Sequence, residues 1–322
     1  MSQTFVKKVA IVGAAGTVGK HIVAALLKTG KHEVTAISRA DSKAATLDGV
    51  KVARVDYDEP SALVDALRSQ DVLIITMAVT APRDTEGKLV KAAADAGVPF
   101  ILPNFWGPDG EKREQLGTDI MLGLRERATV KQIEDLGASA WIGMVTSFWY
   151  EMSLAGPVAF GMDYKNRKWT FYDDGEAKIN VITLPQSGRA VAALLSLPIE
   201  SSTGPSFSKY KNKPVYTASF CVSQKDMFAS VLRVSGTKPD DWQIGHEASS
   251  KRFADGKKQF EGGDVVGFAK LLYARVFYPD GSGNYEASRG LENNVLGLEK
   301  EDIDEFTNLA IQRVESGARY GN

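Results

Sequence analysis

Two periods of hydrophobicity alternate along the first half of the chain, one typical of buried strands and one typical of helices. Residues 9–12 form a short apolar run, and residues 19–28 have apolar positions at helical spacing that stop before Gly30. Further strands are predicted at 33–38, 50–55, 71–76, 99–103 and 139–145, and further helices at 42–47, 61–68, 86–96 and 124–136. Strands and helices that alternate at this spacing form parallel βαβ units. The pattern therefore predicts an α/β fold with a Rossmann-type, doubly wound parallel sheet.

The pattern changes near residue 148 to shorter and more mixed segments. Residues 166–172 alternate like a strand and lead into the turn sequence Asp173-Asp174-Gly175. A helix is predicted at 187–197, which we expect to return and pack on the first lobe, and an acidic helix is predicted at 300–315. We therefore expect a Rossmann domain at 1–150 and, mainly at 151–322, a smaller mixed α/β lobe.

The composition is that of a soluble globular protein and argues against several kinds of partner. Lys and Arg (39) nearly balance Asp and Glu (40), so no net field draws the chain to nucleic acid or to an anionic membrane. No apolar run approaches the ~18 residues of a membrane helix. The single cysteine, Cys221, excludes an internal disulfide, and we expect a reducing, cytoplasmic setting. His21, His32 and His246 lack the spacing of metal ligands, so no metal site is predicted.

Three glycines directly after the first predicted strand form the most informative local motif. In the segment 13–19 (GAAGTVG), the first glycine permits a tight turn, the second a close approach to a pyrophosphate, and the third close packing of helix on strand. The N–H groups that open the next helix attract phosphate. A turn without a ligand is the alternative, but packing alone gives little reason for three glycines here. We predict a nicotinamide dinucleotide site that includes Gly13, Ala15, Gly16, Thr17, Val18 and Gly19.

The end of the second predicted strand favours NADP(H) over NAD(H). An acidic residue at this position binds the ribose 2′-hydroxyl and repels a 2′-phosphate. This chain instead has Ser38 and Arg39, a hydroxyl and a fixed cation that suit a phosphate, although Arg39 is also consistent with a solvated loop cation. Asp56 has a second interpretation as a helix cap. The ends of the later strands add the other predicted cofactor contacts, which are Asp56, Tyr57, Met77, Ala78, Val79 and Asn104.

An ordered set of segments follows the glycine loop and Arg39 along the chain. They are 100–107 (FILPNFWG), 133–137 (IEDLG), 146–150 (TSFWY) and 187–192 (SGRAVA). With this set, the chain resembles the NmrA-like and isoflavone-reductase-like branch of the atypical short-chain dehydrogenases. Segments 164–167 (YKNR) and 277–282 (FYPDGS) resemble a fungal subgroup of that branch. The resemblance implies bound NADP(H), a substrate cleft between two lobes and reduction of aromatic or alkaloid-like molecules, although some members are regulators without catalysis.

The resemblance also implies a catalytic lysine, and here the chain departs from the family. Reductases of the branch carry this lysine near the start of the helix before the sixth strand. Counting back from Ile133 and Glu134 places Glu126 at that position. Lys131 lies about one helical turn further on and takes the role only if the helix is shifted. We therefore name Lys131, Tyr150 and Glu126 as the candidate acid–base residues.

A second catalytic pattern is a false match. Tyr164 and Lys168 have the Y-x-x-x-K spacing of ordinary short-chain dehydrogenases. That chemistry needs both side chains on one helical face, where the ammonium lowers the pKa of the phenol. The surrounding residues alternate like a strand, so we expect an exposed hairpin instead.

Aromatic residues follow the fifth and sixth predicted strands. Trp106, Phe148 and Trp149 are expected to line a substrate pocket at the carboxyl edge of the sheet, with Asn104 or Tyr150 as polar groups. Such a box suits a flat apolar or cationic molecule. The alternative is an aromatic core between the lobes.

We therefore predict an NADP(H)-dependent oxidoreductase that reduces a planar aromatic or alkaloid-like molecule, such as an imine or enone, in secondary metabolism. Two alternatives stay open. One is a non-catalytic, NADP-binding redox sensor. The other is an enzyme that keeps the cofactor and performs a redox-neutral cyclisation or isomerisation, with an acidic group such as Glu126. The expected partner is a small aromatic substrate, and the expected state is a monomer or homodimer.

Overall fold

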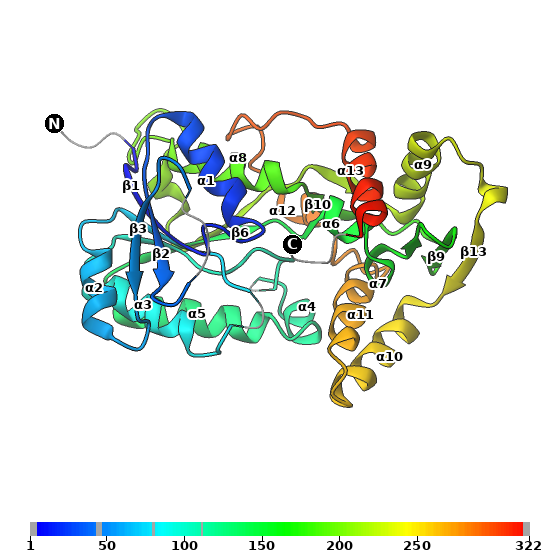
Figure 1. Ribbon diagram of the computed structural model, residues 1–322, viewed down its shortest axis with the longest axis horizontal. Coiled ribbons are helices and arrows are strands. Elements are labelled where there is room, and N and C mark those ends of the chain that lie inside the picture. The colour runs from blue at the N-terminus through cyan, green and yellow to red at the C-terminus, as the bar shows by residue number, and fades with distance from the viewer. Residues whose placement is uncertain (1–4, 43–46, 79–80, 111, 318–322) are drawn as a thin grey trace.

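A seven-stranded parallel sheet forms the centre of the first lobe in the computed structural model, which describes residues 5–42, 47–78, 81–110 and 112–317 (Figure 1). Its strands lie in the order β11 (Lys213–Tyr216), β6 (Ala140–Val145), β5 (Phe100–Leu102), β4 (Val72–Ile75), β1 (Lys8–Val12), β2 (Glu33–Arg39) and β3 (Lys51–Val55). Every neighbouring pair is parallel. The strand order reverses between β1 and β4, and their carboxyl ends border the crevice where such sheets bind ligands.

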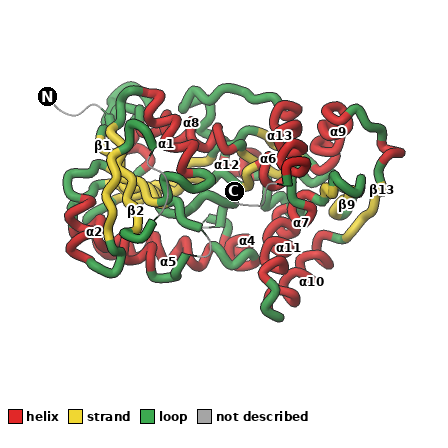
Figure 2. The backbone as a smooth tube through the Cα atoms, in the orientation of Figure 1, coloured by secondary structure: helices red, strands yellow, loops and turns green. Residues whose placement is uncertain are grey.

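Helices cover both faces of this sheet (Figure 2). The alternating residues of β1 belong to two different cores, since Val9 and Ile11 face one layer and Ala10 and Val12 face the other. The first layer contains α1 (Gly19–Thr29) and α8 (Leu184–Leu195). The second contains α2 (Pro60–Leu67), α3 (Thr85–Asp95) and α5 (Gly123–Leu136), and the short α4 (Glu114–Asp119) precedes α5.

The second lobe has short strands and helices around an aromatic-rich core (right half of Figure 1). One small sheet has the order β12 (Phe220–Val222), β10 (Ile179–Ile182), β7 (Phe148–Trp149), and the other has the order β13 (Gln243–Glu247), β9 (Lys168–Tyr172), β8 (Met162–Asp163). The helices are α6 (Tyr150–Leu154), α7 (Pro157–Phe160), α9 (Gln224–Ser235), α10 (Ser249–Glu261), α11 (Val265–Val276), α12 (Tyr285–Arg289) and α13 (Ile303–Ser316), with a 3-10 turn at Pro239–Asp241; a second 3-10 turn, at Phe207–Tyr210, packs on the core of the first lobe. The fully buried rings of Phe160, Trp169 and Phe277 mark the centre of this core.

The predicted Rossmann-type fold is confirmed, and its strands and helices lie within a few residues of the predicted bounds. The sheet has one strand more than predicted, because β11 pairs with β6 along Lys213–Tyr216. The helix α8 packs on α1, where a Cβ on Gly188 would collide with the backbone of His21. The helix α8, the 3-10 turn at Phe207–Tyr210 and the strand β11 thus pack in the first lobe, although they follow residue 150 in the chain. The helix predicted at 42–47 falls mainly outside the described residues.

The Y-x-x-x-K match lies in a hairpin and not on a helix. Tyr164 follows β8, and Lys168 begins β9, which pairs with β8 in antiparallel register. The predicted turn after β9 is also present, since Gly175 has a φ of 75° and donates its N–H to the carbonyl of Tyr172. The pair therefore cannot form the one-face arrangement that the short-chain dehydrogenase mechanism needs.

The described residues contain neither a membrane-spanning helix nor a metal-binding cluster. No helix there is both long and apolar enough to cross a membrane. The same part of the chain contains no group of three or more His, Cys, Asp or Glu side chains placed to hold a metal ion.

Candidate cofactor site

A cavity of about 1080 Å³ opens at the carboxyl ends of β1, β2, β3 and β4. This volume slightly exceeds the range of about 300–1,000 Å³ that is typical of small-molecule sites. Nine of the predicted cofactor residues line it, namely Gly13, Ala15, Gly16, Ser38, Arg39, Asp56, Tyr57, Met77 and Ala78. Val79 lies outside the described residues. The walls of the cavity thus come mainly from the carboxyl ends of four adjacent strands and the loops that follow them, and α3 adds Thr85 and Lys88.

The glycine loop has the backbone geometry that its sequence predicts. Gly13 has a φ of 80°, and a Cβ there would collide with the carbonyl oxygen of Thr76 at the end of β4. A Cβ on Gly19, the first residue of α1, would collide with the carbonyl of Gly13. Val18 occupies the N-cap position of α1, and its apolar side chain offers no acceptor to the helix N–H groups. These N–H groups therefore suit a phosphate.

Thr17, Val18 and Gly19 support this loop and do not line the cavity. Val18 is buried in the core below α1, and Gly19 is the contact between helix and strand. Their effect on a ligand is therefore indirect, through the position of the loop.

Ser38 and Arg39 end β2 at the rim of the cavity. The side chain of Arg39 is 68% exposed, and its Nε lies 3.6 Å from Asp41. Tyr57 lines the same end and donates its hydroxyl to the carbonyl of Ile37, 3.0 Å away. Burial raises the pKa of Tyr57 to about 12, so the phenol is neutral at physiological pH. This end of the cavity is polar and carries an exposed cation.

Asn104 fixes the loop after β4 and is not itself part of the cavity wall. Its side-chain amide accepts from the N–H of Met77 at 3.0 Å and donates to the carbonyl of the same residue at 3.2 Å. Its own N–H donates to the carboxylate of Glu86, which is buried and also forms an ion pair with Arg125 of α5. The predicted cofactor contact is thus a positioning residue, held by an ion pair that joins α3 to α5.

The structure adds two cations to the cavity wall that sequence reasoning missed. Arg54, in β3, donates from Nη1 to the carbonyl of Ser42, and Lys88, in α3, bridges Asp58 and Asp84. The hydrogen bonds that Lys88 donates to the two carboxylates raise its pKa. Arg54 could have been found from its place two residues before Asp56, but no local pattern marks Lys88.

The three candidate acid–base residues lie apart, and none lines the cavity. Lys131 is 75% exposed and pairs with Asp135, because α5 turns Val130 and Ile133 inward and Lys131 outward. The ring of Tyr150 is fully buried in the second lobe, with its hydroxyl 2.7 Å from that of Thr307. These positions argue against Lys131 and Tyr150 as proton donors.

Glu126 is buried on the inner side of α5. Its carboxylate packs on the loop before α4, where a Cβ on Gly110 would lie 2.6 Å from Oε2. The residue in the expected lysine position therefore serves packing between α5 and this loop.

The predicted aromatic box is also divided between two cores. Phe148 stacks on Tyr273 in the second lobe, with ring centroids 4.1 Å apart. Trp106 is buried in the first lobe and donates its Nε1–H to the carbonyl of Ile75. Trp149 is half-buried against that same first core. Phe148 and Trp106 are thus core residues, as in the alternative of an aromatic core. Of the three predicted pocket residues, Trp149 has the partly accessible ring.

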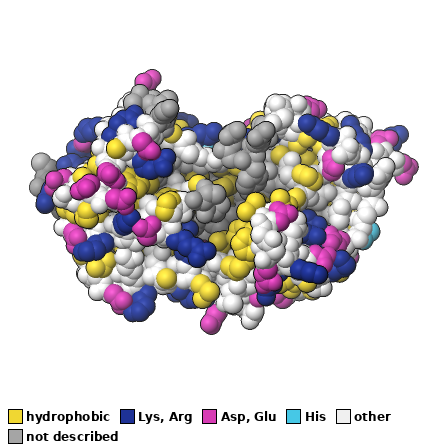
Figure 3. Space-filling view, turned by 60° about the horizontal axis from the view of Figure 1, so that its bottom comes forward, with side chains coloured by type: hydrophobic (Ala, Val, Ile, Leu, Met, Phe, Trp, Pro, Cys, Tyr) yellow, Lys and Arg dark blue, Asp and Glu magenta, His cyan; other side chains and the backbone are white. Residues whose placement is uncertain are grey.

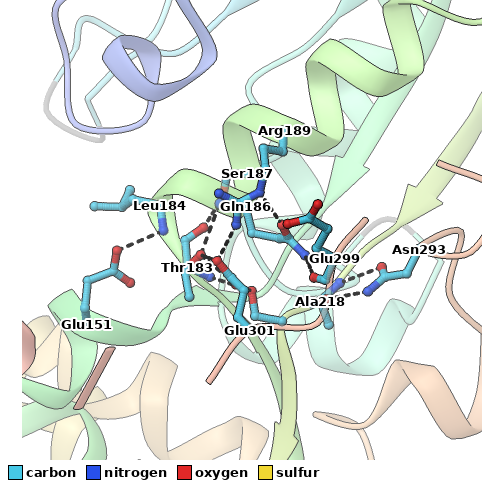
Figure 4. A network of polar contacts seen from close by, with 11 residues as sticks. Glu151, Thr183, Leu184, Gln186, Ser187, Arg189, Ala218, Asn293, Glu299 and Glu301 are labelled. Carbon is cyan, nitrogen blue, oxygen red and sulfur yellow. Dashed lines mark hydrogen bonds and ion pairs between the residues drawn. The ribbon is translucent and has the colours of Figure 1, made fainter. Parts of the chain in front are cut away.

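A polar network that the sequence did not indicate joins the lobes at the start of α8 (Figure 4). The largely buried carboxylate of Glu301 accepts hydrogen bonds from Thr183 and Ser219 and pairs with Arg189. Glu151, just after β7, accepts the N–H of Leu184 at 3.0 Å. Segments from three parts of the chain are thereby held together.

Comparisons with known proteins agree with this site and fold. Residues 13–135 match a family model described as NAD(P)H-binding. The oxidoreductase aprR of Aspergillus flavus is 24% identical over 301 residues, which cover 92% of this chain and 96% of that protein. A solved structure of AtPrR2 with NADP+ and (+)pinoresinol has a TM-score of 0.76 at 17% identity, and covers 96% of this chain and 100% of its own.

A crystal structure of an isoflavone reductase has a TM-score of 0.74 at 18% identity, and covers 94% of this chain and 98% of its own. At such identities the likeness to solved structures concerns the fold, while the family model concerns the domain that contains the cavity. The nicotinamide cofactor predicted from the glycine loop is therefore confirmed. Residues 13–135 thus form an NAD(P)H-binding domain, the chain is similar over nearly its whole length to a fungal oxidoreductase, and its fold is that of the isoflavone reductases, in agreement with the resemblance seen in the sequence.

Proposed function

We propose that the protein is a cytoplasmic, NADP(H)-dependent reductase of a planar aromatic or alkaloid-like molecule in secondary metabolism. The observation that carries the proposal is the cavity itself, where the glycine loop faces Ser38 and the exposed Arg39 at the end of β2. The solved relatives that contain NADP+ with pinoresinol, or NADPH in a quinone oxidoreductase of Escherichia coli, support the choice of cofactor.

The residues of the cavity fit this cofactor from one end to the other. The loop residues Gly13, Ala15 and Gly16, which line the cavity just before α1, would hold the pyrophosphate, and Gly13 leaves the space that it needs. Ser38 and Arg39 would hold the 2′-phosphate, with Asp56 and Tyr57 beside the adenosine. Met77 and Ala78, fixed by Asn104, would lie along the nicotinamide ribose. When bound, the nicotinamide supplies a hydride.

The substrate is expected where the two lobes meet, beyond the nicotinamide end of the cavity. Apolar side chains gather near the middle of the face in Figure 3. Met121 and Leu124, beside the start of α5, are 38% and 62% exposed. Exposed apolar side chains of this kind suit a flat, apolar molecule. The neighbours named for pinoresinol and isoflavone reduction support the same class of substrate.

An iminium, or an imine that is protonated before it binds, fits this site better than an enone, because its reduction needs no acid–base residue. Lys131 is paired with Asp135 in solvent, and Tyr150 is bonded to Thr307 in a core, so neither approaches the cavity. A substrate that already carries positive charge at the reacting C=N group becomes neutral on accepting a hydride and needs no further proton. An enone would need a proton from solvent.

The same observation favours a second candidate function, an NADP(H)-binding redox sensor without turnover. A sensor needs the cavity and not an acid–base residue. The two candidates share cofactor binding and differ only in whether NADPH is consumed.

A titration followed by a turnover assay tests both. The purified protein is titrated with NADPH and NADH by fluorescence, and NADPH oxidation is then followed with a panel of aromatic imines and enones. Preferential NADPH binding with substrate-dependent oxidation supports the reductase. Preferential binding without oxidation of any panel member supports the sensor, and failure to bind either nucleotide contradicts both.

A further inference from the structure

The end of β3 carries a second arginine at the rim of the cavity, next to the two residues that the sequence assigns to the 2′-phosphate. In the parallel register of β2 and β3, Arg54 is the partner of Ser38. Their neighbours Ile37 and Ala53 contact the core on the α2 side of the sheet. Since side chains alternate along a strand, Ser38 and Arg54 both point to the opposite face. Both also line the cavity.

Arg54 holds the loop that follows β2. Its Nη1 donates to the carbonyl of Ser42 at 2.5 Å, and the N–H of Ala40 donates to the carbonyl of Val55 at 3.0 Å. These two bonds attach residues 40–42 to the end of β3. The guanidinium is therefore fixed in direction, with one N–H used and the others available on the side of the cavity.

The charges around the cavity distinguish Arg54 from the other cations that the described residues bring to its wall. Lys88 lies 2.6 Å from Asp58 and 2.5 Å from Asp84, and Arg39 lies 3.6 Å from Asp41. The acceptor that the structure shows for Arg54 is instead a neutral carbonyl. A planar guanidinium with donors to spare is the side chain best suited to bind two oxygens of a phosphate.

We propose that Arg54 is a second selectivity residue for the 2′-phosphate of NADP(H), and that with Arg39 and Ser38 it clamps this phosphate across the carboxyl ends of β2 and β3. The inference rests on the proposed binding of NADP(H) and adds a residue to that site. Because Asp41 offsets part of the charge of Arg39, Arg54 contributes the larger share of the selectivity.

The test uses 2′,5′-ADP and 5′-AMP, two adenosine ligands that differ only in the 2′-phosphate, together with NADPH and NADH. Arg54→Met keeps an unbranched stem of similar length to that of arginine and removes the guanidinium with its charge. We expect this variant to weaken the binding of 2′,5′-ADP and NADPH by at least about tenfold, because charged hydrogen bonds are lost. The dissociation constants of 5′-AMP and NADH should change less than about twofold. The affinity of Arg54→Lys for 2′,5′-ADP and NADPH should lie between those of Arg54→Met and the wild type, because an ammonium keeps the charge but not the fork of donors.

Arg68→Met is the matched control, since Arg68 is exposed on the neighbouring α2 side and does not line the cavity. It should leave all four dissociation constants unchanged. If Arg54→Met weakens both members of each ligand pair equally, or neither, the clamp is overturned. Should that variant fail to fold, Arg54→Lys decides by the same ratio of dissociation constants. A wild-type protein that binds neither NADPH nor NADH would instead overturn the proposed function.

Discussion

The carboxyl ends of β1–β4 and those of β5 and β6 lie at one edge of the same sheet, but they differ in construction. The first four end in an open cavity with polar and charged walls, where glycines leave room for a ligand. After β6 the chain instead enters packed aromatic cores through Ser147, which is buried and has a φ of 56°. The cofactor half of the site is thus formed by local backbone geometry, whereas the substrate half depends on how the lobes pack.

Three buried polar atoms sharpen this contrast. Thr146 Oγ1, Trp149 Nε1 and Glu151 Oε2 find no hydrogen-bond partner within the described part of the chain. Together with the positive φ of Ser147, they place backbone strain and unsatisfied polar atoms in the six residues after β6. We therefore expect substitutions near β1 to change the free energy of unfolding or the affinity for the cofactor. Substitutions after β6 should instead change how the free energy of unfolding depends on pH.

The largest effect is expected at Gly13. Gly13→Ala forces a Cβ into the carbonyl of Thr76 at a residue with a φ of 80°, and should lower the free energy of unfolding by about 3 kcal/mol or more. Gly30→Ala is the control, since Gly30 has a φ of 66° but open space around its Cβ position, and it should cost about 1 kcal/mol. Denaturant unfolding measures both. Equal losses would show that the contact with Thr76 is unimportant.

The next effect concerns Glu151 and has a defined pH dependence. Burial raises the pKa of Glu151 from its usual 4.5 to about 7. The folded state therefore binds this proton more tightly than the unfolded state, and the associated stability is present below about pH 4.5 and lost as pH rises to about 7. Glu151→Gln stays neutral at every pH and keeps an acceptor for the N–H of Leu184. Between pH 4.5 and pH 8, its free energy of unfolding should therefore rise by about 2 kcal/mol relative to that of the wild type.

Unfolding by urea at pH 4.5 and at pH 8 checks this prediction for Glu151. The exposed Glu315 provides a matched control, because Glu315→Gln should alter the difference between the two pH values by less than about 0.5 kcal/mol. A Glu151→Gln protein with the same pH dependence as the wild type would show that this carboxyl is not desolvated.

A smaller effect is expected for Arg39→Ala. Loss of its charge should weaken the binding of NADPH by about tenfold and that of NADH by less than about twofold, because only NADPH carries the 2′-phosphate. Fluorescence titration gives both dissociation constants, with Arg68→Ala as the control outside the cavity. Equal weakening of the two nucleotides would remove Arg39 from the 2′-phosphate site.

The smallest effect on activity is expected for Lys131→Ala and Tyr150→Phe. Neither residue reaches the cavity, so kcat for a substrate found in the panel should change less than about twofold. Tyr150→Phe removes the hydrogen bond to Thr307 and should cost about 1 kcal/mol of stability. A fall of kcat by a factor of about 100 in either variant would mean that the lobes rearrange when substrate binds.

The sequence by itself determined the elements whose signals are local. Strand and helix periods, the turn at Gly13 and the hydroxyl and cation at Ser38 and Arg39 depend on neighbouring residues, and the structure has them where the sequence predicts them. The ordered set of segments that carries the family resemblance, among them 100–107 and 146–150, was also legible in the sequence, since such patterns extend along the chain without reference to packing.

Only the tertiary structure decided which side chains meet. The register of β2 and β3 brings Arg54 beside Ser38, and the pairing of β11 with β6 brings a late strand into the first sheet. The helical phase of α5 turns Lys131 to solvent, and the turn at Ser147 carries Phe148 into another core. These outcomes depend on contacts between residues far apart in the chain, and the free energy of burial that selects them has no signature in a local pattern.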